Sequence, residues 1–184
     1  NRKPPVLVSE TSGFPSSRKA WSRSKRKNTK PGEASTAADP YTNMDKELSC
    51  KREILVRFNE ADPLGIVWHG HYIRYFEDGR EAFGETHGLK YLDVYQQGFV
   101  IPVVNVQCDF KKSLRYGDRV VVETKYIPCE AAKLKFAYRL FNAATGDLVA
   151  TGSSVQVFLS KEDSVLQLAN PPFFEEWKQK HDLC

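Results

Sequence analysis

Residues 58–81 decide the fold of this chain, and they read FNEADPLGIVWHGHYIRYFEDGRE. The alternation of side chains over residues 54–58 leads into this stretch and predicts a strand with at least one buried face. The strand then stops at Asp62, Pro63 and Gly65, because proline fixes φ and glycine accepts backbone angles that other residues resist. A carboxylate therefore lies in a turn that follows a strand.

A helix is predicted from about Gly70 to a stop near Gly88. Its signal is a set of residues at spacings of three and four, which marks one face of a helix: Tyr72, Tyr75, Phe76, Gly79, Phe83 and His87. The first turn of a helix carries unpaired backbone N–H groups and the positive end of the helix dipole, so it favours an anion. Asp62 would lie close to that turn, which predicts a functional site.

The stretch from Asp62 to Tyr72 resembles a motif of the hotdog-fold acyl-CoA thioesterases of the 4-hydroxybenzoyl-CoA thioesterase type, which include Tol-Pal-associated bacterial relatives. A second motif, FKKSLRYGD at residues 110–118, resembles the turn that joins two sheet strands in the same family. The resemblance spans roughly residues 50–180. It implies an α+β hotdog fold over residues 44–184, in which a curved antiparallel sheet of about five strands wraps one long central helix.

The resemblance also implies acyl-CoA hydrolysis, in which Asp62 attacks the thioester carbonyl or activates a water that does so. Backbone N–H groups near His69 and Gly70 would hold the oxyanion. Gly65 and Tyr72 would help to position the substrate, and His69 would orient it or carry a proton. A general base contributes about 10²- to 10⁴-fold and an oxyanion donor about 10²- to 10³-fold, so an activated thioester needs no cofactor.

The same residues also have simpler interpretations. Asp62 could only brace its turn, and His69 could be an ordinary first residue of the helix. Many relatives carry asparagine at the position of His71, which leaves the role of this histidine open. A metal site of His69, His71 and His87 would need cysteine or carboxylate ligands at a suitable spacing, which the sequence lacks, so we expect no metal.

Basic residues of the second motif are the candidates for binding coenzyme A, since its phosphates need cations near the mouth of the site. Lys111, Lys112 and Arg115 come first by position, and Lys133 and Lys135 come next. The latter pair alternates with apolar residues, which any half-exposed strand also does.

The rest of the domain is predicted to be sheet with two short helices. A strand over residues 99–110 is expected to be buried because of Ile101, Val103, Val104 and Val106. The other predicted elements are strands at 119–127, 133–142 and 148–159 and helices at 91–97 and 172–177. Such a sheet leaves an edge open to another subunit, so we expect a homodimer, with a tetramer as the open alternative.

Residues 1–43 hold nine basic and three acidic residues, which leaves eighteen basic and twenty acidic residues for the remainder. The segment is rich in Ser, Pro, Lys and Arg, which is typical of a disordered basic extension or leader. Its run Ser24–Lys27 is similar to a nuclear-localisation or nucleic-acid patch, and its composition to an organelle-targeting peptide. Met44, the only methionine, stands just before the first strand and favours an extension. We expect no nucleic-acid partner.

The four cysteines, Cys50, Cys108, Cys129 and Cys184, show no paired spacing and no zinc or redox motif. They indicate thiols in a reducing compartment, and therefore a cytoplasmic protein. No run of residues approaches the roughly 18 apolar residues that a membrane span needs.

The sequence thus predicts an acyl-CoA thioesterase that releases a carboxylic acid and free CoA. Two other functions stay open, namely a module that binds acyl thioesters without turnover and another hotdog enzyme such as a hydratase or dehydratase. The Asp-Pro-x-Gly-Ile-Val motif argues against the latter. Aromatic, naphthoyl and aliphatic acyl groups and acyl-carrier-protein thioesters all stay open, because one methylene changes discrimination by only about 1–3 kcal/mol.

Overall fold

The computed structural model describes residues 48–183, so the predicted extension over residues 1–43 lies outside the described residues. Its main element is a five-stranded antiparallel sheet in the order β1-β4-β5-β6-β3, and β2 and β7 form a separate pair. The strands are β1 (Ser49–Leu55), β2 (Phe99–Val100), β3 (Val103–Phe110), β4 (Arg119–Tyr126), β5 (Lys133–Asn142), β6 (Leu148–Val157) and β7 (Leu159–Ser160). The helices are the 3₁₀ turn η1 (Phe58–Glu60), α1 (Gly70–His87), α2 (Tyr91–Gln96) and α3 (Pro172–Lys180).

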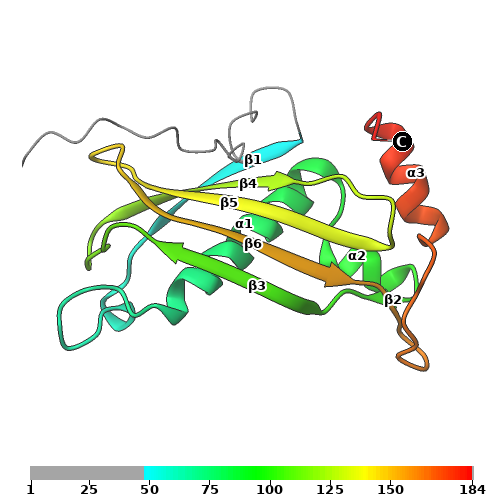
Figure 1. Cartoon of the computed structure of the whole chain (residues 1–184), viewed down its shortest axis with the longest axis horizontal. Helices are drawn as coiled ribbons and strands as arrows, with labels where there is room; N and C mark the ends of the chain where they lie inside the picture. Colours follow the sequence, from blue (N-terminus) through cyan, green and yellow to red (C-terminus); the bar gives the residue numbers. More distant parts are fainter. Residues whose placement is uncertain (1–47, 184) are drawn as a thin grey trace, which may run out of the picture. The chain divides into compact units, whose positions relative to one another are not determined.

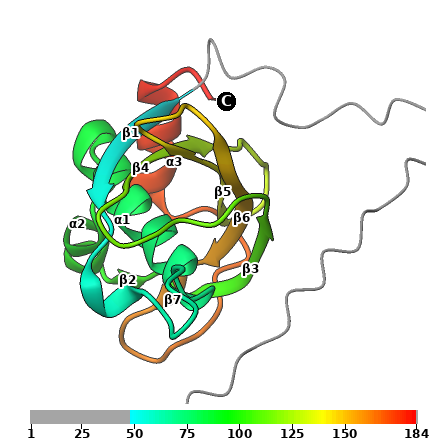
Figure 2. The same cartoon turned by 90° about the vertical axis from the view of Figure 1, so that its left-hand side faces the viewer.

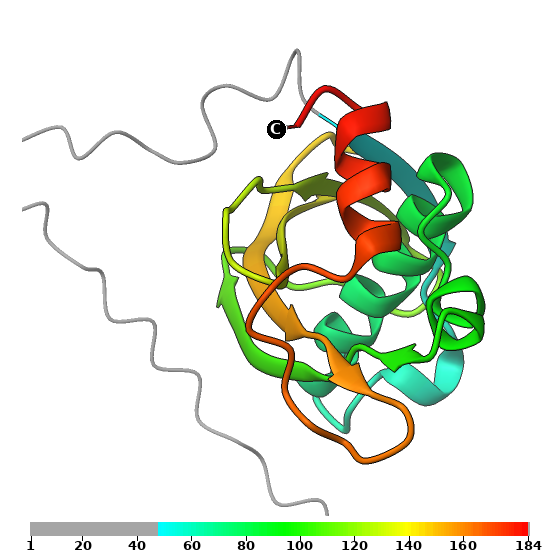
Figure 3. The same cartoon turned by 90° about the vertical axis from the view of Figure 1, so that its right-hand side faces the viewer.

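Helix α1 runs along the inner face of the five-stranded sheet, which curves around it (Figure 1, Figure 2). Helix α3 lies across one end of the curved sheet (Figure 3). The α1 helix ends as predicted, because Gly88 adopts a φ of +74° and its N–H donates to the carbonyl of Gly84 at 3.0 Å. One long helix wrapped by five antiparallel strands confirms the predicted fold class.

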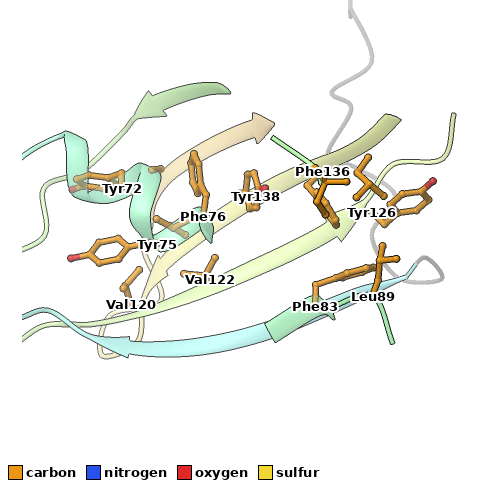
Figure 4. Close-up of a cluster of buried hydrophobic side chains, with 14 of the residues drawn as sticks. Tyr72, Tyr75, Phe76, Phe83, Leu89, Val120, Val122, Tyr126, Phe136 and Tyr138 are labelled. Atoms are coloured by element: carbon orange, nitrogen blue, oxygen red, sulfur yellow. The ribbon is translucent and has the colours of Figure 1, made fainter. Parts of the chain in front are cut away.

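Aromatic rings join α1 to the sheet (Figure 4). The Phe76 ring stacks on Tyr138 of β5, with centroids 4.2 Å apart and planes 8° apart, and both side chains are fully buried. Small residues permit this close approach, since a Cβ on Gly79 would lie 2.3 Å from Thr124 Oγ1. The middle of α1 is therefore fixed on the sheet, and this sets the position of its first turn.

The predicted strand over residues 54–58 is wrong at its end, because β1 stops at Leu55. Phe58 lies in η1 and is 79% exposed, where the alternation had predicted a buried side chain. The cause is the carboxylate of Glu60, which accepts the backbone N–H of Arg57 at 2.8 Å and turns the chain out of the sheet.

The predicted buried strand over residues 99–110 is wrong in two respects. It is divided into β2 and β3, which are separated by residues 101 and 102. Pro102 interrupts the strand because proline has no N–H to donate within a sheet. The second part, β3, is an edge strand on which Val103, Val104 and Val106 are 43%, 58% and 38% exposed. The three valines that predicted burial within one chain therefore lie on an open edge, whereas Ile101, between β2 and β3, is buried as predicted.

The remaining predicted elements agree with the structure. Strand β5 spans the predicted residues, β4 and β6 end one and two residues earlier, and α3 extends three residues further. Among residues 48–183, no helix has the length and apolar character that crossing a membrane requires.

Candidate active site

The turn between η1 and α1 is closed by hydrogen bonds within residues 62–66. The Asp62 N–H donates to the carbonyl of Ile66 at 2.8 Å, and Asp62 Oδ1 accepts the N–H of Leu64 at 2.8 Å. Gly65 has a φ of +74°, which a residue with a Cβ adopts only with strain. The carboxylate is thus held through Oδ1, and no described residue donates a hydrogen bond to its Oδ2.

Backbone hydrogen bonds join the two ends of the same turn and connect it to a distant segment. At the two ends, the Trp68 N–H donates to the carbonyl of Glu60 at 2.9 Å. Further along the chain, the Val67 N–H donates to the carbonyl of Leu114 at 2.8 Å. The second bond brings the two sequence motifs into contact, although Val67 and Leu114 are more than forty residues apart in the chain.

Helix α1 begins directly after this turn. The N–H groups of His71 and Tyr72 donate to carbonyls of the preceding turn at 2.9 and 3.3 Å, whereas those of His69 and Gly70 donate to no described residue. A Cβ on Gly70 would lie 1.8 Å from Trp68 Cζ3, so the absence of a side chain lets the indole lie over the helix start. Two backbone donors at a helix N-terminus are therefore available to an anion.

A cavity of about 230 Å³ opens where the turn, the helix start and the second motif meet. The residues that line it come from all three segments: Asp62, Ile66, Val67, His69, Tyr72, Phe110, Lys111, Lys112 and Ser113. The Phe110 ring stands edge-on to Tyr72, with centroids 5.0 Å apart. The cavity thus combines a carboxylate, two cations and an aromatic wall. A larger hollow of about 440 Å³ beside α3 has no residue of either motif in its lining.

Tyr72 connects the helix to the second motif within this cavity. Its hydroxyl accepts the backbone N–H of Leu114 at 3.3 Å. Burial raises the pKa of Tyr72, so the hydroxyl keeps its proton at neutral pH. It can therefore donate that proton to an oxygen acceptor in the cavity.

Five of the predicted site residues come together here: Asp62, His69, Tyr72, Lys111 and Lys112. Gly65 and Gly70 shape the turn and the helix start without lining the cavity. Arg115 lies outside the lining, and its backbone N–H closes the next turn by donating to Asp118 Oδ2 at 2.8 Å.

The two lysines of the cavity differ in their partners. Lys112 Nζ lies 2.6 Å from Asp147 Oδ1, and the hydrogen bond from Lys112 lowers the pKa of Asp147. Both side chains are open to solvent, so this ion pair is weak and can give way to another anion. Lys111 forms no ion pair with a described residue, which leaves its charge free for a ligand.

Sequence reasoning missed Phe110 and Ser113 as cavity residues. Both belong to the second motif, which was interpreted as a turn that supplies cations. Their proximity to Asp62 depends on the bond between Val67 and Leu114, which no local pattern predicts. The available signal was their position immediately beside Lys111 and Lys112.

Comparison with known proteins agrees with the fold. The chain matches the thioesterase-like superfamily over residues 56–180. YneP of Bacillus subtilis (strain 168), provisionally named an acyl-CoA thioesterase, is 36% identical over 112 residues, or 61% of this chain and 80% of YneP. A DHNA-CoA thioesterase from Staphylococcus aureus superposes with a TM-score of 0.67 at 27% identity, over 73% of this chain and 91% of that one. A 4-hydroxybenzoyl-CoA thioesterase variant shares the fold at 22% identity, with a TM-score of 0.62 over 71% and 98% of the two chains.

A long helix wrapped by a curved antiparallel sheet is the hotdog fold, and relatives that are named thioesterases make the class of this protein a thioester hydrolase. This chain belongs to the thioesterase-like superfamily, which confirms the family that the two motifs predicted.

Proposed function

We propose that this enzyme hydrolyses an acyl-CoA thioester to a carboxylic acid and free coenzyme A, with Asp62 as its main chemical group. The observation that carries the proposal is that Asp62, whose Oδ2 accepts no hydrogen bond from a described residue, lines one cavity with His69, whose unused N–H stands directly before α1. The provisional name of YneP and the activity of the staphylococcal enzyme support CoA thioesters as the substrate class.

In the general-base path, Asp62 takes a proton from a water while the water oxygen bonds to the thioester carbonyl carbon. The carbonyl oxygen becomes an oxyanion, which the N–H groups of His69 and Gly70 stabilise, and such a donor contributes about 10²- to 10³-fold. The C–S bond then breaks, and the CoA thiolate takes up the proton. In the alternative path, Asp62 itself bonds to the carbonyl carbon and expels the thiolate, and water hydrolyses the resulting anhydride to the same acid.

The other cavity residues would bind the two parts of the substrate. Lys111 and Lys112 supply charge for the phosphates of coenzyme A, and Arg115, outside the lining, would reach only a more distant part of the nucleotide. His69 and Tyr72 would orient the thioester, since both side chains border the cavity beside Asp62.

We propose further that strand β3 pairs with a second copy of this chain. Edge strands carry unpaired backbone groups that can accept another strand, and β3 adds the exposed side chains of Val103, Val104 and Val106. Phe110, the last residue of β3, and Lys111, which follows it, line the cavity, so a partner on this edge would lie beside the site. A dimer is the smallest assembly that covers β3, and a tetramer stays open.

A reducing compartment such as the cytoplasm suits the thiols of the described residues. Cys50, Cys108 and Cys129 are free, and burial raises the pKa of Cys50 and of Cys108 to about 11. The thiols of Cys50 and Cys108 are therefore protonated at neutral pH and react slowly.

Thiol release from a panel of aromatic and aliphatic acyl-CoA thioesters tests the proposal. Asp62→Asn should lower turnover by at least about 100-fold, the lower end expected for a lost base. Asp93→Asn, an exposed aspartate of α2, is the matched control and should leave turnover unchanged. Circular dichroism verifies that both variants fold. Turnover that survives in Asp62→Asn would contradict the role of Asp62, and a wild-type protein that binds acyl-CoA without turnover would instead be a binding module.

A further inference from the structure

The carboxylate of Glu60 is buried in an unusual way. The residue is 2% exposed, yet it forms no ion pair with any residue of the described range. Its Oε2 instead accepts two neutral donors at 2.8 Å each, the backbone N–H of Arg57 and the hydroxyl of Tyr75. Burial of a carboxylate without a cation lowers the stability of the folded state. The two hydrogen bonds offset part of this loss, and they are the contacts that Glu60 contributes to the structure.

We propose that Glu60 and Tyr75 are positioning residues for catalysis: their buried hydrogen bond locks the Asp62 turn to α1 and fixes the carboxylate relative to the helix start. This inference rests on the proposed thioesterase function, and it adds a pair of residues that touch neither the substrate nor the cavity.

The position of Glu60 in the chain suits this task. It stands two residues before Asp62, and its carbonyl accepts the N–H of Trp68, the second residue before α1. Its side chain reaches Tyr75, which is fully buried in the second turn of α1. One residue therefore contacts the beginning of the turn, the end of the turn and the helix. Without this bond, no side-chain hydrogen bond between described residues would join the base of the turn to α1.

The direction of both hydrogen bonds is fixed by chemistry. Burial raises the pKa of Tyr75, and the hydrogen bond to Glu60 raises it further, so the phenol stays protonated and donates. The Arg57 N–H can only donate. Position 60 must therefore supply an acceptor, and because both donors reach the same oxygen, the amide oxygen of a glutamine could replace it.

Loosening this bond should affect the chemical step more than the binding step. A misplacement of about 1 Å can lower a rate by roughly 10²-fold. The lysines proposed to bind coenzyme A belong to the second motif, which the hydrogen bond from the Leu114 N–H to the Tyr72 hydroxyl ties to α1 without involving Glu60. We therefore expect kcat to fall while the affinity for the CoA part of the substrate is preserved.

The experiment compares Tyr75→Phe and Glu60→Gln with the wild-type protein. Tyr75→Phe should lower kcat by about 10- to 100-fold and leave the Kd of a non-hydrolysable acyl-CoA thioether within about twofold. Glu60→Gln should retain most of kcat, because it keeps the acceptor. Tyr138→Phe is the control, since it removes another buried hydroxyl, which is hydrogen bonded to Ser154 at 2.6 Å and to Arg80 at 3.0 Å but to no residue of the turn.

Amide hydrogen exchange of Val67 and Trp68 gives a readout that does not depend on activity. Faster exchange of these amides in Tyr75→Phe but not in Tyr138→Phe supports the lock, even if the wild-type protein releases no thiol and the proposed function fails. Wild-type turnover with unchanged kcat and unchanged exchange in Tyr75→Phe would overturn the lock while the function stands. Equal losses of kcat in Tyr75→Phe and Tyr138→Phe, matched to equal losses of thermal stability, would also overturn it.

Discussion

Replacing Gly152 with alanine should strain the contact that holds α1 on the sheet. A Cβ at this position in β6 would lie 2.3 Å from Phe76 Cζ, 2.5 Å from Phe76 Cε2 and 2.6 Å from the carbonyl oxygen of Gln107, whereas ordinary contacts begin at 3.4 Å. The Phe76 ring cannot retreat, because it is fully buried and stacked on Tyr138 at 4.2 Å. The Gln107 carbonyl belongs to the backbone of β3 and moves only with that strand. The helix must therefore lift from the sheet by about 1 Å.

Overpacking of a rigid core costs about 1–3 kcal/mol of stability. Gly152→Ala should fall in the upper half of that range, because the backbone carbonyl of Gln107 cannot move away from the new Cβ as a flexible side chain could. For a domain of this size, about 2–3 kcal/mol corresponds to a fall in Tm of roughly 4–12 °C. Urea and thermal unfolding at one fixed protein concentration measure both quantities. Ser153→Ala, the half-buried neighbour on the same strand, is the control and should change Tm by less than about 2 °C. A Gly152→Ala protein as stable as the wild type would refute the tight packing of Phe76.

Two further predictions follow from charge and from the open edge. Burial raises the pKa of Glu123, but hydrogen bonds from Lys51 and Arg139 outweigh this effect and lower the pKa overall. The ionised carboxylate therefore stabilises the folded state at neutral pH, and this contribution is lost as the pH falls below the ordinary glutamate pKa of about 4.3. Urea unfolding between pH 3 and 7 should show a steeper loss of stability towards acid for the wild type than for Glu123→Gln; parallel curves would contradict this. Val106→Lys, which puts a charge on β3, should convert the proposed dimer to monomer in light scattering without lowering helix content, and an unchanged mass would exclude β3 as the interface.

The local parts of the fold were predictable because each depends on neighbouring residues. The start of α1 at Gly70 and its stop at Gly88 follow from the spacing of apolar residues and from a glycine at positive φ. The turn at Asp62 follows from proline and glycine at the positions that need them. These two elements are adjacent in the chain, so the sequence also placed the carboxylate beside the helix start.

Long-range features were not predictable from one sequence. The apolar pattern of β3 is the same whether its side chains face a core or an open edge, because a pattern records what is apolar and not what covers it. Phe58 continued an apparent alternation, but the hydrogen bond from the Arg57 N–H to Glu60 ended the strand first. Likewise, Phe110 and Ser113 became cavity residues only through a hydrogen bond between two distant turns.

The first two turns of α1 explain how these separate pieces form one site. Tyr72 and Tyr75 are three residues apart, so they lie on the same side of the helix, and their rings are neighbours at 6.0 Å (Figure 4). The Tyr72 hydroxyl accepts a hydrogen bond from the second motif, at Leu114, whereas the Tyr75 hydroxyl donates one to the base of the Asp62 turn, at Glu60. One face of one helix thus holds both the cation-bearing segment and the carboxylate turn, and the hydrogen bond from the Val67 N–H to the Leu114 carbonyl joins these two segments directly. It follows that a change that displaces Leu114 should disturb both segments, whereas the loss of one tyrosine hydroxyl removes only one of the two ties to the helix.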